Sequence, residues 1–155
     1  MIGIYNDYIT NKECDEFVNF YKSHKENIIN INDDVYRFDG VSLINNLNDF
    51  TFLNRIKIPI DIIDRIRVQR VGPDINTFHS FHRDWLPQTF IIFLNEEFEG
   101  GELIYENIII TPKKLQMVTS TGDEWHYVKK VTSGDRFTLV CFLKNIFDFK
   151  SKKLL

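Results

Sequence analysis

The segment Phe137-Thr-Leu-Val-Cys-Phe-Leu143 is a short apolar run that follows the turn signal Thr132-Ser-Gly-Asp135. Its length and its aromatic and β-branched residues are typical of a buried strand. Similar runs, rich in Ile, Val, Phe and Tyr and separated by turn signals, lie at 66–68, 90–94, 103–105, 108–110 and 117–118. Many short strands at such spacing indicate a β-sandwich or barrel, and eight of them would form a jelly roll.

The N-terminal part has a different pattern. A helix is predicted over residues 10–24, because Thr10-Asn-Lys-Glu13 matches a capping box and an apolar face follows at helical spacing. The other expectations are a loop over 27–34, a strand over 35–44 bent at Asp39-Gly40, and a short helical turn over 47–52. The predicted fold class is therefore mainly β with an N-terminal helix, α+β overall.

Length and composition are those of one globular domain. The chain has 155 residues, 43% of them hydrophobic and 26% charged. We expect a single domain over 1–155, with a helical N-terminal part over about 1–60 and a β core over about 62–146. Alanine is absent, whereas Ile, Asn, Lys and Phe are abundant, and these four have AT-rich codons. This bias suggests a phage or an AT-rich bacterial genome as the source.

Charge and hydropathy argue against several partners. The formal net charge is -3, which favours neither a phosphate backbone nor an anionic membrane. The longest apolar runs are too short to span a bilayer, and Met1-Ile-Gly-Ile-Tyr5 lacks the features of a signal peptide. Cys14 and Cys141 lie far apart in sequence and are expected to be buried free thiols. A cytoplasmic location fits these features best.

Three of the four histidines lie in the β half, and one of them belongs to the triplet His82-Arg-Asp84. Residues two apart on a strand project to the same face, so this imidazole and carboxylate can reach one ion. His126 is a candidate third ligand. Two histidines and one carboxylate form the facial triad of non-haem iron(II) oxygenases, which leaves three positions open. Taken alone, the residues also fit a histidine paired with an acid and a separate core histidine.

Arg136, ten residues after His126, is the context that favours a metal site. A dicarboxylic cosubstrate that chelates iron through its keto-acid end needs a fixed cation for its other carboxylate. Arginine suits this role because its planar fork binds a carboxylate bidentately and stays charged when buried. An arginine that faces inward from an apolar strand needs an anionic partner. The alternative is a strand-end arginine facing water, since Gly134-Asp135 is a turn.

Residues 66–143 resemble the catalytic domain of the prolyl 4-hydroxylase group of Fe(II)- and 2-oxoglutarate-dependent oxygenases. The matching stretches, similar in order and spacing as well as content, are Arg70-Val-Gly-Pro-Asp74, His82-Arg-Asp84, 93–103, Thr111-Pro-Lys-Lys114 and 126–139. The resemblance implies a double-stranded β-helix, which is a jelly-roll variant. It also implies Fe(II) bound by His82, Asp84 and His126.

The same resemblance implies that Arg136 binds the distal carboxylate of 2-oxoglutarate, with Thr138 on the same strand face as a second contact. Several members of the group place a tyrosine three residues before the first metal histidine, where this chain has His79. Others carry a tyrosine on the following strand, where this chain has Ile92. His79 therefore either hydrogen-bonds the cosubstrate or lines the strand.

The activity implied by the resemblance is that of a dioxygenase that uses O₂, with ascorbate as a supporting reductant. The expected reaction is hydroxylation of an unactivated C–H bond, with a prolyl residue in a peptide or protein as the leading substrate. A free amino acid or another small molecule stays open as the substrate, as does a non-enzymatic jelly-roll binding module. Asp84 favours hydroxylation over halogenation, because related halogenases lack this carboxylate.

Two further expectations concern the substrate. Nucleic acid is disfavoured, because nucleic-acid demethylases of this superfamily usually carry a second arginine shortly after the first, and 137–143 contains none. Trp85 and Trp125 flank metal ligands in sequence, so they either form an aromatic rim that grips the substrate or pack in the core. Any lid over the site is expected from residues 30–50 or 72–80.

Overall fold

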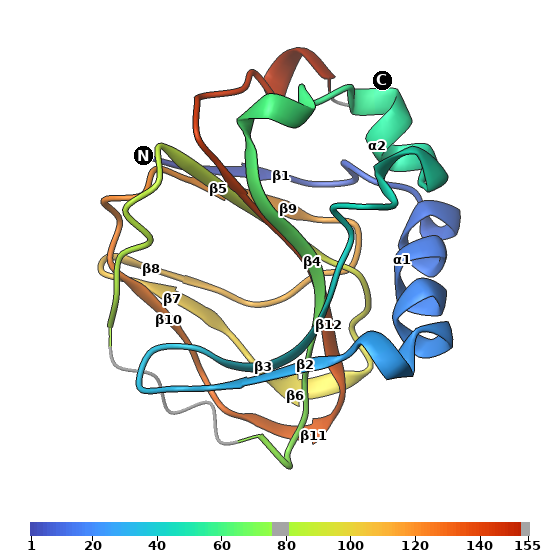
Figure 1. Cartoon of the computed structure of the whole chain (residues 1–155). Coiled ribbons are helices and arrows are strands. Elements are labelled where there is room, and N and C mark those ends of the chain that lie inside the picture. Colours follow the sequence, from blue (N-terminus) through green and yellow to red (C-terminus); the bar gives the residue numbers. More distant parts are fainter. Residues whose placement is uncertain (76–80, 153–155) are drawn as a thin grey trace.

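The computed structural model of the protein describes residues 1–75 and 81–152 (Figure 1). The N-terminal elements are β1 (Ile2–Tyr5), α1 (Asn11–Ser23), β2 (Ile29–Asn32), β3 (Arg37–Ser42) and α2 (Thr51–Ile56). The later strands are β4 (Ile63–Val71), β5 (Gln88–Phe93), β6 (Phe98–Gly100), β7 (Leu103–Tyr105), β8 (Ile108–Ile110), β9 (Met117–Ser120), β10 (His126–Val128), β11 (Val131–Gly134) and β12 (Arg136–Leu143). Short 3-10 turns lie at Lys25–Asn27, Leu47–Asp49, Ile60–Ile62 and Lys150–Lys152.

The strands form one large sheet and two small ones. The large sheet has seven strands in the order β1-β9-β5-β12-β4-β3-β2, and every neighbouring pair is antiparallel. The small sheets have the orders β10-β7-β8 and β11-β6. Helices α1 and α2 lie on one side of the large sheet and the small sheets on the other (Figure 1). This is the predicted jelly roll, so the mainly β, α+β fold class is confirmed.

Strand β12 lies at the centre of the large sheet and separates two layers of side chains. Its residues alternate between the faces of the sheet, as the strand period of two requires. Phe137, Leu139 and Cys141 belong to the main hydrophobic core under the helices. Arg136 and Val140 instead line a pocket between the large sheet and the small sheets. One strand therefore builds an apolar core on one side and, on the other, a cavity whose lining is largely apolar but includes the triad and Arg136.

The predicted N-terminal helix is confirmed, including its capping box. Thr10 caps α1: its side chain accepts from the Glu13 backbone N–H at 3.1 Å, and the Glu13 carboxylate accepts from the Thr10 N–H at 3.0 Å. Glu13 also pairs with Arg55 at 3.0 Å, which ties α1 to α2. Burial opposes ionisation of Glu13, but hydrogen bonds from Arg55 and Thr10 outweigh it and hold the pKa of that carboxyl below its usual value.

The N-terminal part also contributes strands that the sequence did not indicate. The loop expected over 27–34 is wrong, because β2 occupies Ile29–Asn32 and pairs with β3. Strand β1 was not predicted either, and it pairs with β9. Both are edge strands of the large sheet. An edge strand needs only one backbone partner and tolerates exposed polar side chains, so neither composition nor alternation identifies it. The strand expected over 35–44 and the helical turn over 47–52 are confirmed.

The two cysteines are buried free thiols, as predicted. Burial raises the pKa of the Cys14 thiol to about 12, and it raises that of Cys141 as well. Both side chains therefore remain protonated and belong to the hydrophobic core. None of the helices in the described ranges is long and apolar enough to cross a membrane.

Candidate active site

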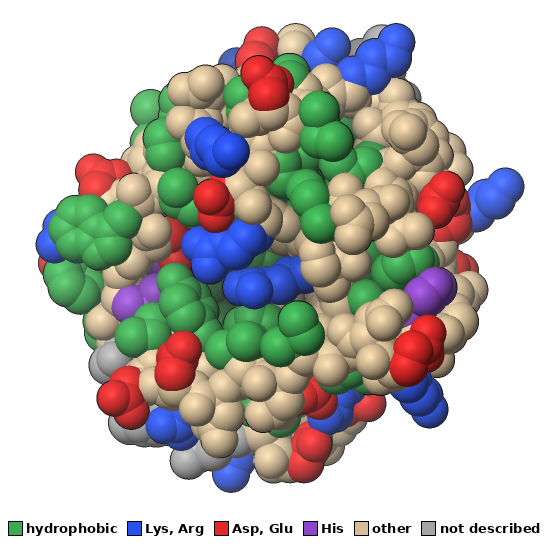
Figure 2. Space-filling view, viewed as in Figure 1, with side chains coloured by type: hydrophobic (Ala, Val, Ile, Leu, Met, Phe, Trp, Pro, Cys, Tyr) green, Lys and Arg blue, Asp and Glu red, His purple; other side chains and the backbone are tan. Residues whose placement is uncertain are grey.

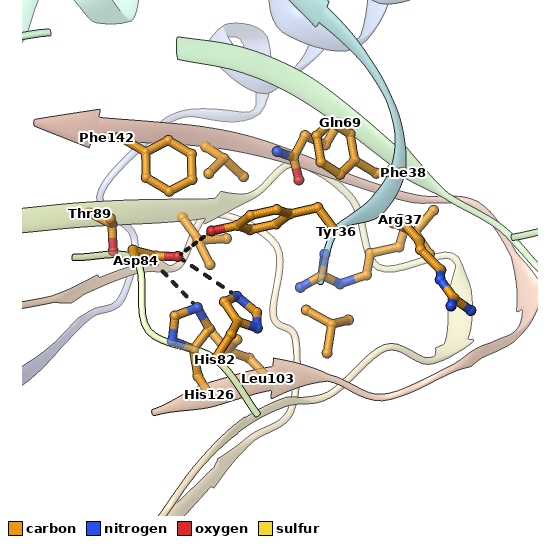
Figure 3. Close-up of a pocket in the computed structure, with 15 residues that line it drawn as sticks. Tyr36, Arg37, Phe38, Gln69, His82, Asp84, Thr89, Leu103, His126 and Phe142 are labelled. Carbon is orange, nitrogen blue, oxygen red and sulfur yellow. Dashed lines mark hydrogen bonds and ion pairs between the residues drawn. The ribbon is translucent and has the colours of Figure 1, made fainter. Parts of the chain in front are cut away.

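The three predicted metal ligands meet at one end of the pocket (Figure 3). His82 and Asp84 lie between β4 and β5, and His126 begins β10. The Asp84 carboxylate faces both rings, with Oδ1 3.7 Å from His82 Nε2 and Oδ2 3.5 Å from His126 Nε2. One ligand atom from each residue lies within 4.8 Å of the other two. This spacing suits one metal ion held on one face by two nitrogens and one oxygen.

A backbone bridge sets the positions of the two histidines. The His82 N–H donates to the His126 carbonyl at 3.1 Å, and the His126 N–H donates to the His82 carbonyl at 3.0 Å. The ring centroids lie 4.4 Å apart as a result. The expectation that His82 and Asp84 share a strand is corrected, because only this isolated bridge forms there. The bridge fixes the position of His82, and the two-residue spacing still places the Asp84 side chain on the same side of the chain as that of His82.

The hydrogen bonding of His126 leaves one ring nitrogen available. Its Nδ1 lies 3.0 Å from the backbone carbonyl of Glu124. A carbonyl oxygen can only accept, so Nδ1 carries the proton and the lone pair of Nε2 faces Asp84. This is the tautomer in which an imidazole ligates a metal through Nε2. A donor set of imidazole nitrogens and one carboxylate fits Fe(II). The distances between the ligand atoms and the hydrogen bond that orients the His126 ring both support this metal.

Tyr36 contacts the triad and was not found by sequence reasoning. It lies just before β3, and its hydroxyl donates to Asp84 Oδ1 at 3.1 Å. Its ring packs edge-on against His82, with centroids 5.0 Å apart. Burial, followed by the charge of Asp84, raises the pKa of Tyr36 above its usual value, so the hydroxyl remains a donor. The segment 30–50 was expected to supply a lid, but Asp33-Asp34-Val-Tyr36 carries no local signal that singles out this tyrosine.

Arg136 lies at the start of β12 and lines the same pocket as the triad. Its side chain is buried, so the alternative of an arginine facing water is wrong. Its Nε donates to the Gly101 carbonyl at 3.0 Å, whereas Nη2 is buried without a hydrogen-bond partner in the described parts of the chain. Burial lowers the pKa of the guanidinium to about 10, which leaves it charged at neutral pH. A buried cation with an unused donor fits the carboxylate of a ligand.

Two residues outside the predicted site hold Arg136 in place. Gly101 adopts a φ of 72°, and a Cβ there would lie 2.8 Å from Arg136 Cδ, so only glycine lets the arginine pack here without strain. The Asn95 amide donates to the Asp135 carbonyl at 2.8 Å and accepts from the Phe137 N–H at 2.9 Å. Asn95 therefore clamps the backbone on both sides of Arg136.

Thr138 and His79 were predicted to assist Arg136 in binding the cosubstrate. Thr138 is fully buried, and its hydroxyl has no hydrogen-bond partner within the described ranges. It pairs in register with Gln69 of β4, which lines the pocket, although Thr138 itself does not. His79 lies outside the described residues. The cosubstrate contacts of Thr138 and His79 therefore stay predictions.

Trp85 and Trp125 lie on the outer surface beside the triad. Their exposed fractions are 71% and 41%, so the expectation that they pack in the core is wrong. The Arg83 guanidinium lies between them, 4.0 Å from the Trp85 ring and 4.5 Å from the Trp125 ring. Neither tryptophan lines the pocket that holds the triad. A role for this pair in substrate binding stays a prediction.

Comparison with solved structures identifies the fold. A prolyl hydroxylase from Trichoplax adhaerens, solved with a hypoxia-inducible-factor oxygen-degradation-domain peptide, matches with a TM-score of 0.70 at 15% identity, covering 97% of this chain and 85% of its own. The viral collagen prolyl hydroxylase of Paramecium bursaria Chlorella virus-1, in a 2-oxoglutarate complex, matches with a TM-score of 0.62 at 15% identity, covering 94% and 96%. A 2OG-Fe(II) oxygenase family protein from Burkholderia pseudomallei matches with a TM-score of 0.63 at 15% identity, covering 92% and 84%.

At the level of sequence, no protein-family model and no curated protein matches the chain. The fold is nevertheless that of the 2-oxoglutarate-Fe(II) oxygenases and prolyl hydroxylases over nearly the whole chain. Within this fold, a cluster of two histidines and one aspartate lies in the same pocket as a buried arginine.

Proposed function

We propose that this protein is an Fe(II)- and 2-oxoglutarate-dependent dioxygenase that hydroxylates an unactivated C–H bond. The observation that carries the proposal is the combination of the triad and Arg136 in one pocket. His82, Asp84 and His126 would hold the metal, and the unpartnered Nη2 of Arg136 would bind the distal carboxylate of 2-oxoglutarate. Among the described residues no carboxylate forms an ion pair with Arg136, and only Glu102 acts on its charge at longer range, so a ligand carboxylate would offset the cost of burying this charge.

When bound, Fe(II), 2-oxoglutarate and O₂ supply an oxidant that inserts one oxygen atom into the substrate, with the other going into succinate as CO₂ is released. The chain's own residues position the reactants. Asp84 is oriented by the Tyr36 hydroxyl, and His126 is oriented by the Glu124 carbonyl. Apolar side chains of the pocket, among them Ile91, Leu103 and Val140, exclude water from the reacting groups.

For the substrate, we propose a prolyl residue in a peptide or protein. The fold supports this choice, because one structure that matches it is a prolyl hydroxylase in complex with a peptide. The second candidate is a free amino acid or another small molecule, which the narrow pocket favours, since Tyr36 and Phe38 stand beside the triad. Ascorbate is proposed as a supporting reductant that keeps the iron in its Fe(II) state.

The test is turnover with defined components. The protein would be incubated with Fe(II), 2-oxoglutarate, O₂ and ascorbate, together with prolyl peptides or amino acids. Succinate would be quantified, and mass spectrometry would seek a gain of one oxygen in the substrate. We expect succinate formation that requires both Fe(II) and Asp84, with Asp84→Ala as the inactive control. No succinate with any substrate, together with no Fe(II) binding, would favour the non-enzymatic binding module instead.

A further inference from the structure

A second arginine, Arg67 on β4, faces the pocket side of the large sheet. It pairs in register with Val140, and the next residue on the same face, Arg65, pairs with Phe142. Val140 and Phe142 both line the pocket of the triad. Arg136 pairs with Val71, four residues along β4 from Arg67, which is a separation of about 13 Å along the strand. The pocket face therefore carries Arg67 well apart from Arg136, and Arg37, whose Nε donates to the Asp33 carbonyl at 3.1 Å, is a further arginine in the lining of the triad pocket.

Arg67 lies against two aromatic rings and forms no ion pair with the residues that the structure describes, although the charge of Asp84 acts on it at longer range. Its guanidinium carbon lies 4.4 Å from the Phe38 ring and 5.7 Å from the Phe142 ring. The side chain is half-buried, and its Nε is buried without a hydrogen-bond partner among the residues that the structure describes. In those ranges no carboxylate lies within 4.0 Å of it, whereas Arg55 and Arg70 each have one. An arginine held this way can bind an anionic group of a ligand.

The position of Arg67 links it to the triad. Phe38 and Phe142, which lie against the guanidinium, line the pocket that contains His82, Asp84 and His126, whereas Arg67 itself lines an adjoining pocket that shares Phe38 with it. Arg65 stands beside Arg67 and lies over the Phe142 ring at 4.4 Å, but it is exposed and already pairs with Asp64 at 2.9 Å. Figure 2 shows Lys and Arg side chains gathered at the hollow of this face next to hydrophobic side chains.

We infer that Arg67, with Arg65 beside it, binds a carboxylate of the substrate, so that the oxidised molecule is acidic. The inference rests on the proposed function, because it names a substrate class for the same pocket. Arg136 is occupied by the cosubstrate in that function, so a second anion site has to serve another molecule. The carboxylate belongs either to a free amino acid or to a peptide with an acidic side chain next to the oxidised residue.

Two alternatives have weaker support. Arg83 also stacks on aromatic rings and has a buried Nε without a partner among the described residues, but it lies on the outer surface, whereas Arg67 lies in a pocket that adjoins the triad. A purely structural arginine would pair with a carboxylate, as Arg70 does with Asp39 at 2.9 Å and Asp135 at 2.7 Å. Binding of a substrate carboxylate accounts for both the missing acid and the aromatic cradle.

The first experiment measures binding in the metal-free protein and does not depend on turnover. The probes are N-acetyl-L-proline, which carries a carboxylate, and N-acetyl-L-prolinamide, which does not. The arginine Nε–Hε signals would be followed by NMR, with that of Arg67 assigned through the variant Arg67→Gln. We expect a saturable shift of the Arg67 signal with the acid and none with the amide. An equal response to both probes, or no saturable response at all, would overturn the inference.

Calorimetry with N-acetyl-L-proline compares the parent protein with two matched variants. Arg67→Gln should weaken binding by at least about tenfold, because a charge-assisted pair is lost. Arg65→Gln should weaken it by less than about threefold, since Arg65 is exposed and already paired. Both variants should keep the unfolding temperature of the parent protein. Equal binding by Arg67→Gln and the parent protein would also contradict the proposed site, whether or not the protein turns over any substrate.

A turnover experiment distinguishes the two possible sources of the carboxylate, a free amino acid and an acidic side chain of a peptide. Free acidic amino acids would be compared with prolyl peptides that carry Glu or Gln next to proline. Oxidation of the Glu peptides or of the free acids, at least about tenfold faster than that of the Gln peptides, supports the inference and names the source. Equal oxidation of Glu and Gln peptides refutes it while the proposed function stands. A saturable Arg67 shift without succinate from any substrate refutes the proposed function, and with it the claim that the bound acid is oxidised, while the anion site at Arg67 stands.

Discussion

The two faces of the large sheet differ in how their polar groups are satisfied. On the helix face, Leu139 and Cys141 of β12 pack with Ile66 and Val68 of β4 in an apolar core. On the pocket face, the buried polar atoms without hydrogen-bond partners include Arg136 Nη2, Thr138 Oγ1 and Arg67 Nε, counting only the described residues. The same strands supply both faces. The difference therefore comes from side-chain alternation and not from the backbone.

This difference indicates what each face is for. A buried polar group without a partner costs stability, and a native chain rarely keeps several of them together without a ligand. On the helix side, the buried Glu13 carboxylate is paired with Arg55 and accepts from the Thr10 N–H, and Glu16 Oε2 of α1 is a buried oxygen there without a partner among the described residues. Residues on the helix face contribute most to the free energy of unfolding. Residues on the pocket face contribute to ligand binding at some cost in stability. Substitutions on the two faces should therefore separate stability from ligand affinity.

The largest effect is expected at the triad. Asp84→Ala or His82→Ala should abolish Fe(II) binding and turnover, because the carboxylate bridges the two histidines and a facial triad needs all three groups. Anaerobic metal titration would measure the loss. Asp61→Ala, at an exposed position outside the pocket, is the control and should bind Fe(II) like the parent protein. Fe(II) binding of normal affinity by Asp84→Ala would refute the ligand assignment.

A core substitution should have the opposite profile. Leu139→Ala should lower the free energy of unfolding by about 3 kcal/mol, because it opens a cavity in a fully buried core. Chemical denaturation would measure it. The affinity of the folded protein for 2-oxoglutarate should stay unchanged, since Leu139 faces the helices. Val140→Ala, its neighbour on the pocket face, should cost less stability. A large loss of cosubstrate affinity in Leu139→Ala would contradict the separation of the two faces.

A smaller effect is expected for Tyr36→Phe. The variant removes the hydroxyl that donates to Asp84 but keeps the ring beside His82. Outer-shell hydrogen bonds of this kind change metal affinity by about tenfold, so Fe(II) should bind about ten times more weakly. Metal titration measures the change, and thermal unfolding without metal should show almost none. Tyr127→Phe, whose ring contacts Phe81 and lies outside the pocket lining, serves as the matched control.

The smallest effect is expected for Thr138→Val. The direction in which this variant changes the free energy of unfolding shows whether the hydroxyl has a partner in the unliganded protein. Removing a buried hydroxyl that has no partner within the described residues should leave the free energy of unfolding unchanged or raise it by up to about 1 kcal/mol. If Thr138 contacts the cosubstrate as predicted, affinity for 2-oxoglutarate should fall severalfold in the same variant. Denaturation and calorimetry measure the two quantities. A clear loss of stability would mean that the hydroxyl is satisfied in the unliganded protein.

The pattern of the sequence predicts some parts of the molecule well and others poorly. The capping box of α1 and the strands β4, β5, β7, β8, β9 and β12 follow from local signals, and the structure confirms them. Strands β6 and β11 instead pair where the glycine-containing segments 99–101 and 132–135 were expected to be turns, and β10 was not predicted. The edge strands β1 and β2 could not be predicted, because an edge strand is determined by its pairing partner. At the site, His82, Asp84 and His126 were predicted from ligand chemistry together with the resemblance to the prolyl 4-hydroxylase group, and their ligand atoms lie close together in the structure. Tyr36 and Arg67 were missed because only the folded sheet brings Tyr36 to the triad and Arg67 to the pocket that adjoins it.

The central claim is that Arg136 and the triad bind one cosubstrate together. The most direct test is anaerobic calorimetry of 2-oxoglutarate binding to the Fe(II)-loaded parent protein and to Arg136→Gln. We predict saturable, metal-dependent binding to the parent protein and an affinity about 100-fold lower in Arg136→Gln, because charge-assisted hydrogen bonds to the distal carboxylate are lost. Fe(II) affinity itself should be unchanged in the variant. Equal 2-oxoglutarate affinity in the two proteins, or binding that does not need the metal, would contradict the account.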